Sequence, residues 1–150
     1  MLLRFKKLIP TSKQAEDLYS HLRERRHAIS HDKMPTYVAH LEFLNSHPYR
    51  EWLIIELKKE YFGNVYLQYD NSVALHTVTE LTDSQLLYII KFINLNFEPM
   101  KAIPSVRAGN FFVNVPATDY KLQKKLLRLG LIELQRAYSL QLNSNGEPDV

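Results

Sequence analysis

Residues 111–131 read FFVNVPATDYKLQKKLLRLGL and carry the clearest structural pattern of the chain. The apolar and aromatic run at their start predicts a strand within residues 103–115, which Pro116 ends. Leucines at helical spacing between basic residues then predict an amphipathic helix over residues 119–129. Gly130 stops that helix, and residues 131–142 contain a closing strand. The carboxyl-terminal third is therefore expected to run strand, helix, strand.

Upstream of this stretch, three short runs rich in β-branched and aromatic residues predict antiparallel strands joined by tight turns. They cover residues 52–57, 61–69 and 73–78. Gly63 lies inside the second run, where it indicates a bulge or a close approach of another backbone. After the third run, Thr82 and Gln85 have the spacing of a capping box, which predicts that a helix begins there and extends to Phe97.

The amino-terminal part is expected to contain one strand and two helices. Residues 2–9 read as a strand that Pro10 ends, and a helix capped by Thr11 or Ser12 follows to about residue 26. A second helix starts near Pro35 and stops before Pro48.

The amino-acid composition limits the classes of protein to which this chain can belong. With 150 residues, 45% of them hydrophobic, we expect a single domain over residues 1–142 and a flexible tail over residues 143–150. A net charge of +3 is too small to indicate a nucleic-acid or membrane partner. The absence of cysteine excludes a disulfide framework, and the six histidines show no metal-ligand pattern. Without a secretory pattern or a long apolar run, we expect a cytoplasmic protein.

The order of these elements and three stretches of sequence resemble the GNAT superfamily of acyl-coenzyme A N-acyltransferases. The stretches are residues 114–131, 47–52 and 61–66, and the last two look like the branch that acetylates amino sugars. The resemblance implies an α+β fold with a mixed, mostly antiparallel sheet of six to seven strands and about four helices. It also implies acetyl transfer from acetyl-CoA to the amine of a small molecule, such as an amino sugar or a nucleotide sugar.

Compared with this family, the chain differs in the loop that would hold the cofactor. The family holds the pyrophosphate with spaced glycines between the fourth strand and the next helix, whereas residues 79–84 here contain no glycine and two acids. Leu126 stands where many members have a tyrosine that protonates the departing thiolate, and Leu122 replaces a serine. An alternative is therefore a catalytically inactive GNAT-fold module that binds or regulates a partner.

The resemblance also assigns candidate site residues. His76 would act as the base that deprotonates the amine, although a histidine on a half-buried strand is more often structural. The positions implied for the cofactor are Thr77, Val78, Thr82, Asp83, Ser84, Gln85 and Asn114. For residues 82–85 the competing interpretation is a plain capped helix.

Two clusters of basic residues can each be interpreted in two ways. In the basic segment of residues 23–33, Arg25, Arg26, His27 and His31 either bind the acceptor or form an exposed polar connection. Lys121, Lys124, Lys125 and Arg128 share one helical face, for which a solvated outer surface is favoured over steering of an anionic cofactor or nucleic acid. An exposed edge strand near the carboxyl end would allow a homodimer.

Overall fold

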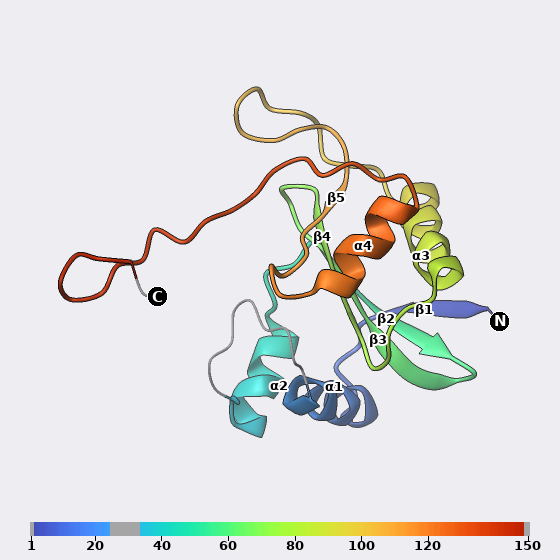
Figure 1. The fold of residues 1–150 in the computed structure, drawn as a ribbon. Coiled ribbons are helices and arrows are strands. Elements are labelled where there is room, and N and C mark those ends of the chain that lie inside the picture. Colours follow the sequence, from blue (N-terminus) through green and yellow to red (C-terminus); the bar gives the residue numbers. More distant parts are fainter. Residues whose placement is uncertain (1, 25–33, 149–150) are drawn as a thin grey trace.

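The computed structural model describes residues 2–24 and 34–148 of the chain. Within them the strands and helices follow one another in the order β1(Leu3–Lys7), α1(Ser12–Glu24), α2(Tyr37–Asn45), β2(Glu51–Leu57), β3(Glu60–Leu67), β4(Ser72–Thr77), α3(Asp83–Asn96), β5(Phe112–Val113) and α4(Tyr120–Arg128) (Figure 1). The strands form one sheet in the order β1-β2-β3-β4-β5. β1 to β4 pair with one another in antiparallel fashion, and β5 is parallel to β4.

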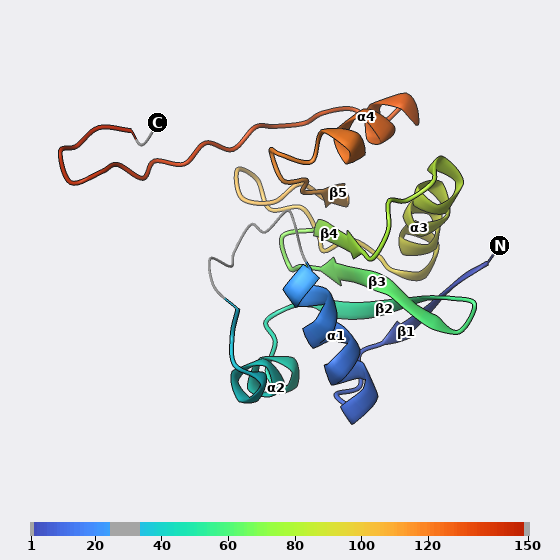
Figure 2. The ribbon, with the colours of Figure 1, turned by 60° about the horizontal axis from the view of Figure 1, so that its bottom comes forward.

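Helices cover both faces of this sheet, α1 and α2 on one side and α3 and α4 on the other (Figure 2). The alternation of side chains along β2 shows why, because Trp52 and Ile54 pack against α1 and α2. Leu53 and Ile55, between and beyond them, pack against α3 and α4. A strand that is buried on both faces reads as a continuous apolar run, as residues 52–55 do.

The structure has both a bulge and a close approach of another backbone at Gly63. The register of β2 and β3 shifts between Ile55 and Glu56, which leaves one extra residue on β3 beside Gly63. A Cβ atom on Gly63 would lie 2.2 Å from the carbonyl oxygen of His76. The lack of a side chain therefore lets β3 and β4 approach each other at the end where β4 leads into α3.

The capping box at the start of α3 is confirmed. Gln85 N–H donates to Thr82 Oγ1 at 3.1 Å, and Thr82 N–H donates to Gln85 Oε1 at 3.0 Å. Leu86, Ile89 and Ile93 of this helix are buried against the sheet.

The expectation of six to seven strands is wrong, since the sheet of the described residues has five. The strand expected within residues 103–115 shrinks to Phe112–Val113. Its earlier part is a loop held beside the β3–β4 turn by Asn71, whose buried amide donates to the carbonyls of Met100 at 2.9 Å and Ala108 at 2.8 Å. The Met100 N–H donates back to Asn71 Oδ1 at 2.7 Å.

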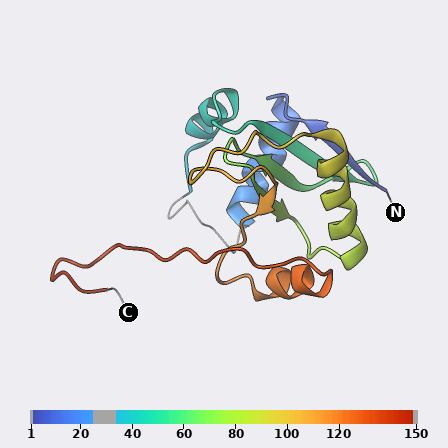
Figure 3. The ribbon, with the colours of Figure 1, turned by 90° about the horizontal axis from the view of Figure 1, so that it is seen from above.

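The closing strand expected within residues 131–142 is not part of the sheet either. These residues run from the end of α4 as an extended, largely exposed segment that leaves the body of the protein (Figure 3). No helix within residues 2–24 and 34–148 is long and apolar enough to cross a membrane.

Candidate functional site

β4 and β5 start as a parallel pair and then part. Phe112 N–H donates to the Asn71 carbonyl at 3.1 Å, and Asn114 N–H donates to the Val73 carbonyl at 2.9 Å. The pairing ends there, because only Ser72 and Val73 have register partners in β5. Beyond this point the chain turns at Pro116 toward α4. The two strands thus share their first residues and open toward the end of β4.

The opening exposes backbone groups of β4. In a strand the N–H and C=O of alternate residues point to the same side. Val73 points to β5, so Leu75 and Thr77 point to the same side, where no β5 residue of the described chain pairs with them. These N–H and C=O groups can bind a ligand that lies along the strand.

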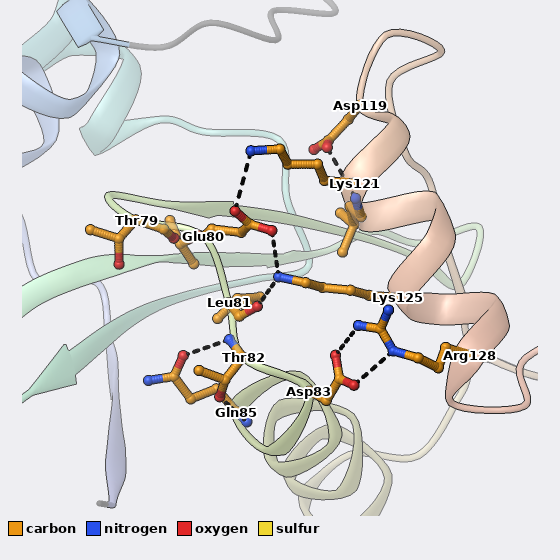
Figure 4. Close-up of polar contacts among 12 residues, drawn as sticks. Thr79, Glu80, Leu81, Thr82, Asp83, Gln85, Asp119, Lys121, Lys125 and Arg128 are labelled. Carbon is orange, nitrogen blue, oxygen red and sulfur yellow. Dashed lines mark hydrogen bonds and ion pairs between the residues drawn. The ribbon is translucent and has the colours of Figure 1, made fainter.

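The loop after β4 is tied to α4 by ion pairs across the fold (Figure 4). Lys125 Nζ donates to Glu80 Oε1 at 2.8 Å and to the Leu81 carbonyl, and Lys121 Nζ lies 3.4 Å from Glu80 Oε2. Arg128 binds both carboxylate oxygens of Asp83, at 2.6 and 2.9 Å. We call these five charged residues, Glu80, Asp83, Lys121, Lys125 and Arg128, the α4 clamp.

The ion pairs of the α4 clamp lower the pKa of its two carboxyl groups. The hydrogen bond from Lys125, aided by the charges of Lys121 and Lys125, lowers the pKa of Glu80. The hydrogen bond from Arg128 lowers the pKa of Asp83 in the same way. A carboxyl group with a lowered pKa contributes stability above its ordinary pKa, and that contribution is lost as the pH falls through the lowered value. The clamp is therefore intact at neutral pH and weakens only in acid, as the pH falls through the lowered pKa values of Glu80 and Asp83.

The structure refines the interpretation of the basic face of α4. Lys121, Lys124 and Arg128 are exposed, as a solvated outer face predicts, but Lys121, Lys125 and Arg128 also form ion pairs with Glu80 and Asp83. The Lys125 side chain is only 13% exposed. A contact between residues 45 apart in the chain leaves no local signal, so sequence patterns could not reveal it. The N-terminus of α3 thus has both its capping box and charged partners from α4.

A cavity of about 180 Å³ lies on the other face of the sheet, under α1 and α2. Most of its described walls are aromatic or aliphatic. The lining residues are Leu18, His21, Leu22, Pro35, Ala39, His40, Phe43, Tyr49, Trp52, Asn64 and Tyr66. None of these carries a carboxylate.

His76 lies on β4 beside two residues that line this cavity, although it is not itself one of the lining residues. Its register partner on β3 is Asn64, and its ring lies 5.6 Å from the ring of Tyr66, so both neighbours line the cavity. Since Ala74 packs with the residues under α1 and α2, His76, two positions later, points to the same face. β4 therefore has open backbone groups at its edge and an imidazole on the sheet face that α1 and α2 cover.

Hydrogen bonds hold the floor of the cavity in place. Asn64, 1% exposed, accepts from Trp52 Nε1 at 3.0 Å and donates to the hydroxyl of Tyr61 at 2.6 Å. On the helical side, His40 Nε2–H donates to the Ala15 carbonyl at 3.2 Å, joining α2 to α1. The sequence shows Asn64 only as a polar residue inside a strand, and this gave no indication of its role.

Burial gives His40 a pH-dependent effect on stability. Desolvation lowers the pKa of His40, and the hydrogen bond to Ala15 opposes this only in part. The unfolded chain therefore binds the proton more readily, and stability is lost as the pH falls below about 6.5. We expect the free energy of unfolding to fall between pH 7.5 and 5.5, and to fall less in His40→Gln, whose amide can still donate to Ala15. Urea unfolding at both pH values measures this, and an equal fall in the variant would refute it.

The remaining predicted site residues divide into two groups. Thr77 ends β4 and Val78 follows it, Thr82 and Gln85 form the cap, Ser84 is exposed, and Asn114 joins β5 to β4 through its backbone. Arg25, Arg26, His27 and His31 lie outside the described residues, so their assignment to an acceptor stays a prediction.

The fold is similar to that of several solved structures. An integron cassette protein from the mobile metagenome of V. cholerae matches with a TM-score of 0.60 and 10% identity, over 97% of this chain and 95% of that one. AAC(6')-Iy, in complex with the bisubstrate analogue CoA-S-monomethyl-acetylneamine, matches with a TM-score of 0.54 and 13% identity, over 94% and 98%. A possible acetyltransferase from Clostridium difficile 630 matches with a TM-score of 0.50 and 9% identity, over 95% and 99%.

The sequence itself matches no protein-family model and no curated protein. At such low identities the structural matches establish the fold, which is that of the GNAT acetyltransferases. The fold predicted from the sequence resemblance is confirmed in this respect. Activity does not follow from the fold and has to be argued from the site.

Proposed function

We propose that the protein is an N-acyltransferase that moves an acetyl group from acetyl-CoA to the amine of a small molecule. The observation that carries the proposal is the separation of β4 from β5. It leaves the backbone of Leu75 and Thr77 open at one edge, while the His76 ring of the same strand lies 5.6 Å from the ring of Tyr66, which lines the cavity. A thioester held along the edge and an amine held in the cavity would meet at β4.

Acetyl-CoA supplies an acetyl group that is already activated as a thioester. The strand edge would hold and orient this donor through the N–H and C=O groups of Leu75 and Thr77. His76 would take the proton that the amine nitrogen loses when its bond to the carbonyl carbon forms. As the C–S bond breaks, the sulfur leaves with the electron pair and gains a proton from water, since Leu126 cannot donate one.

The described walls of the cavity favour an acceptor with one ring over a large polycation. The side chains of Tyr49, Trp52 and Tyr66 can pack on the apolar face of a sugar or an aromatic ring. A volume of about 180 Å³ suits one such ring. A polycationic acceptor would instead need carboxylates, which these walls lack. An amino sugar therefore fits the walls better than a multi-ring aminoglycoside.

An assay of thiol release tests the proposal with acetyl-CoA and three amines, namely glucosamine, benzylamine and the multi-ring aminoglycoside neamine. We expect acetylation of a single-ring amine with a kcat/KM at least about tenfold above that for neamine. Mass spectrometry of the amine confirms the transfer. Absence of any acetylated product at millimolar donor and acceptor would contradict the proposal.

The α4 clamp favours a second candidate function, a GNAT-fold binding module that no longer uses acetyl-CoA. Glu80 and Asp83 place two carboxylates where the family resemblance puts the pyrophosphate, and their ion pairs occupy the cations of α4. The acyl end of the site therefore fits the donor, whereas the pyrophosphate end fits it only after the clamp opens. A protein that neither binds nor consumes acetyl-CoA in any variant would support this candidate.

Removing the charges of the clamp should strengthen cofactor binding. The double variant Glu80→Gln, Asp83→Asn frees Lys121, Lys125 and Arg128 to face the pyrophosphate and removes two repelling charges. At about 1 kcal/mol for each pair of charges 4 Å apart in water, we expect acetyl-CoA to bind at least about fivefold more tightly. Calorimetric titration measures this.

Glu16→Gln changes an exposed charge on α1, on the opposite face of the sheet from α3 and α4, and serves as the control. We expect its affinity for acetyl-CoA to equal that of the unaltered protein. Equal affinities of the double variant and this control would show that the clamp does not oppose the cofactor.

A further inference from the structure

The carboxyl-terminal segment has the pattern of a half-buried strand without being in a sheet. Apolar side chains occupy five of six alternate positions, at Ile132, Leu134, Tyr138, Leu140 and Leu142, and Arg136 interrupts them. The positions between them hold polar or small residues, Glu133, Gln135, Ala137, Ser139 and Gln141. This period of two predicts one face buried against apolar surface and one face in water.

In the structure that apolar face is exposed. Ile132 is 81% exposed, Tyr138 77% and Leu140 91%. Within the described chain, the backbone groups of residues 132–141 make no hydrogen bond to the backbone of another segment. A lone strand with unpaired backbone and exposed apolar side chains is unstable in water unless a sheet receives it.

An open sheet edge exists in the same molecule. β5 is the last strand in the order, with β4 on one side only. Because Phe112 and Asn114 direct their N–H groups to β4, the backbone groups of Phe111, Val113 and Val115 point outward. These three have no backbone partner among residues 2–24 and 34–148. Within the described residues, the β5 edge thus has no partner strand, and residues 132–141 have no sheet edge with which to pair.

The end of α4 fixes the direction in which the segment leaves. Gly130 N–H donates to the Leu127 carbonyl at 3.0 Å, and Leu131 N–H donates to the Leu126 carbonyl at 3.1 Å. With Gly130 at a φ of 89°, this is a Schellman motif. The segment then runs away from the sheet of its own chain (Figures 1 and 3). At about 3.3 Å per residue, its 12 residues extend roughly 40 Å, far enough to reach another molecule.

We propose that residues 131–142 of one copy add as a strand to the β5 edge of a second copy, which returns its own segment to the first. The chain carries both the strand and the edge, so the exchange is reciprocal and closes with twofold symmetry. Each sheet gains the strand that the sequence pattern predicts and that its own chain does not supply. The exchange does not depend on the proposed acyl transfer.

Sedimentation equilibrium of the full chain tests this at concentrations from about 1 to 100 µM. We expect a mass of twice the 17.6 kDa of one chain. The double variant Leu134→Asp, Leu140→Asp places two charges on the apolar face and should be monomeric, with the dissociation constant raised at least about 100-fold. The matched control, Gln135→Asp with Gln141→Asp, puts the same charges on the polar face and should remain a dimer.

Hydrogen exchange of the unaltered protein provides a readout that does not depend on the folding of a variant. In the dimer, the amides of residues 132–141 should alternate between fast and slow exchange, with the slow set about 100-fold slower than in an unpaired peptide. The proposal is overturned by a monomer at 100 µM, by a dimer that survives the charges on the apolar face, or by uniformly fast exchange in the dimer. A monomer with protected amides would mean that the segment pairs with its own β5, which also overturns the exchange.

Discussion

Gly63→Ala is expected to lower the free energy of unfolding by about 3 kcal/mol or more. The added Cβ would lie 2.2 Å from the His76 carbonyl oxygen and 2.8 Å from the Thr77 Cα, and both are backbone atoms. Because no rotamer change can move them, β3 and β4 must separate at the bulge. Urea unfolding followed by circular dichroism measures the loss. The same variant should also impair acyl transfer, since β4 carries the exposed edge and His76.

Gly109→Ala is the matched control for this prediction. The Cβ added at Gly109 would meet the Cβ of Ala102 at 3.3 Å, in a loop where the neighbour is exposed and can move. We expect a change of less than about 1 kcal/mol. Equal losses in the two variants would mean that the close approach of β3 and β4 does not stabilise the sheet.

His76→Gln is expected to lower kcat for acyl transfer by about 100-fold while changing KM little. Glutamine retains a hydrogen-bonding group of similar size but cannot take up the amine proton. The acid limb of the pH–rate profile should disappear with the imidazole, which a purely structural role would not cause. His47→Gln makes the same change in a histidine that packs on Tyr49 and Trp52 of the cavity wall, and this control should keep the acid limb of the pH–rate profile. A His76→Gln variant with the kcat and pH profile of the unaltered enzyme would show that His76 is structural.

Sequence patterns predicted those parts of the fold that depend on residues close together in the chain. The start of α3 depends on Thr82 and Gln85, three residues apart, and its capping box was found from the sequence. Likewise, Gly63 signalled the bulge because a glycine inside a strand weakens it and is found mainly where the strand bulges or another backbone comes close. Strands β2, β3 and β4 were predicted within a few residues of their observed bounds.

Contacts between distant residues were beyond such patterns. A strand was predicted where the chain forms a loop. The side chain of Asn71 holds this loop through hydrogen bonds to Met100 and Ala108, about 30 residues or more away. The ion pairs of α4 with Glu80 and Asp83 were not predicted, because these partners belong to another element. The strand pattern of residues 131–142 was read from the sequence, but a pattern cannot name the edge with which a strand pairs.

Acyl transfer at this site requires that the parted strands β4 and β5 receive the acyl donor. A titration of ¹⁵N-labelled protein with acetyl-CoA, followed through the amide resonances of Leu75 and Thr77, tests it most directly. We predict that these two resonances shift saturably, together with those of residues 82–85, at micromolar to millimolar donor. If the Leu75 and Thr77 resonances stay in place at millimolar acetyl-CoA, the strand edge does not hold the donor and the proposed acyl transfer is contradicted.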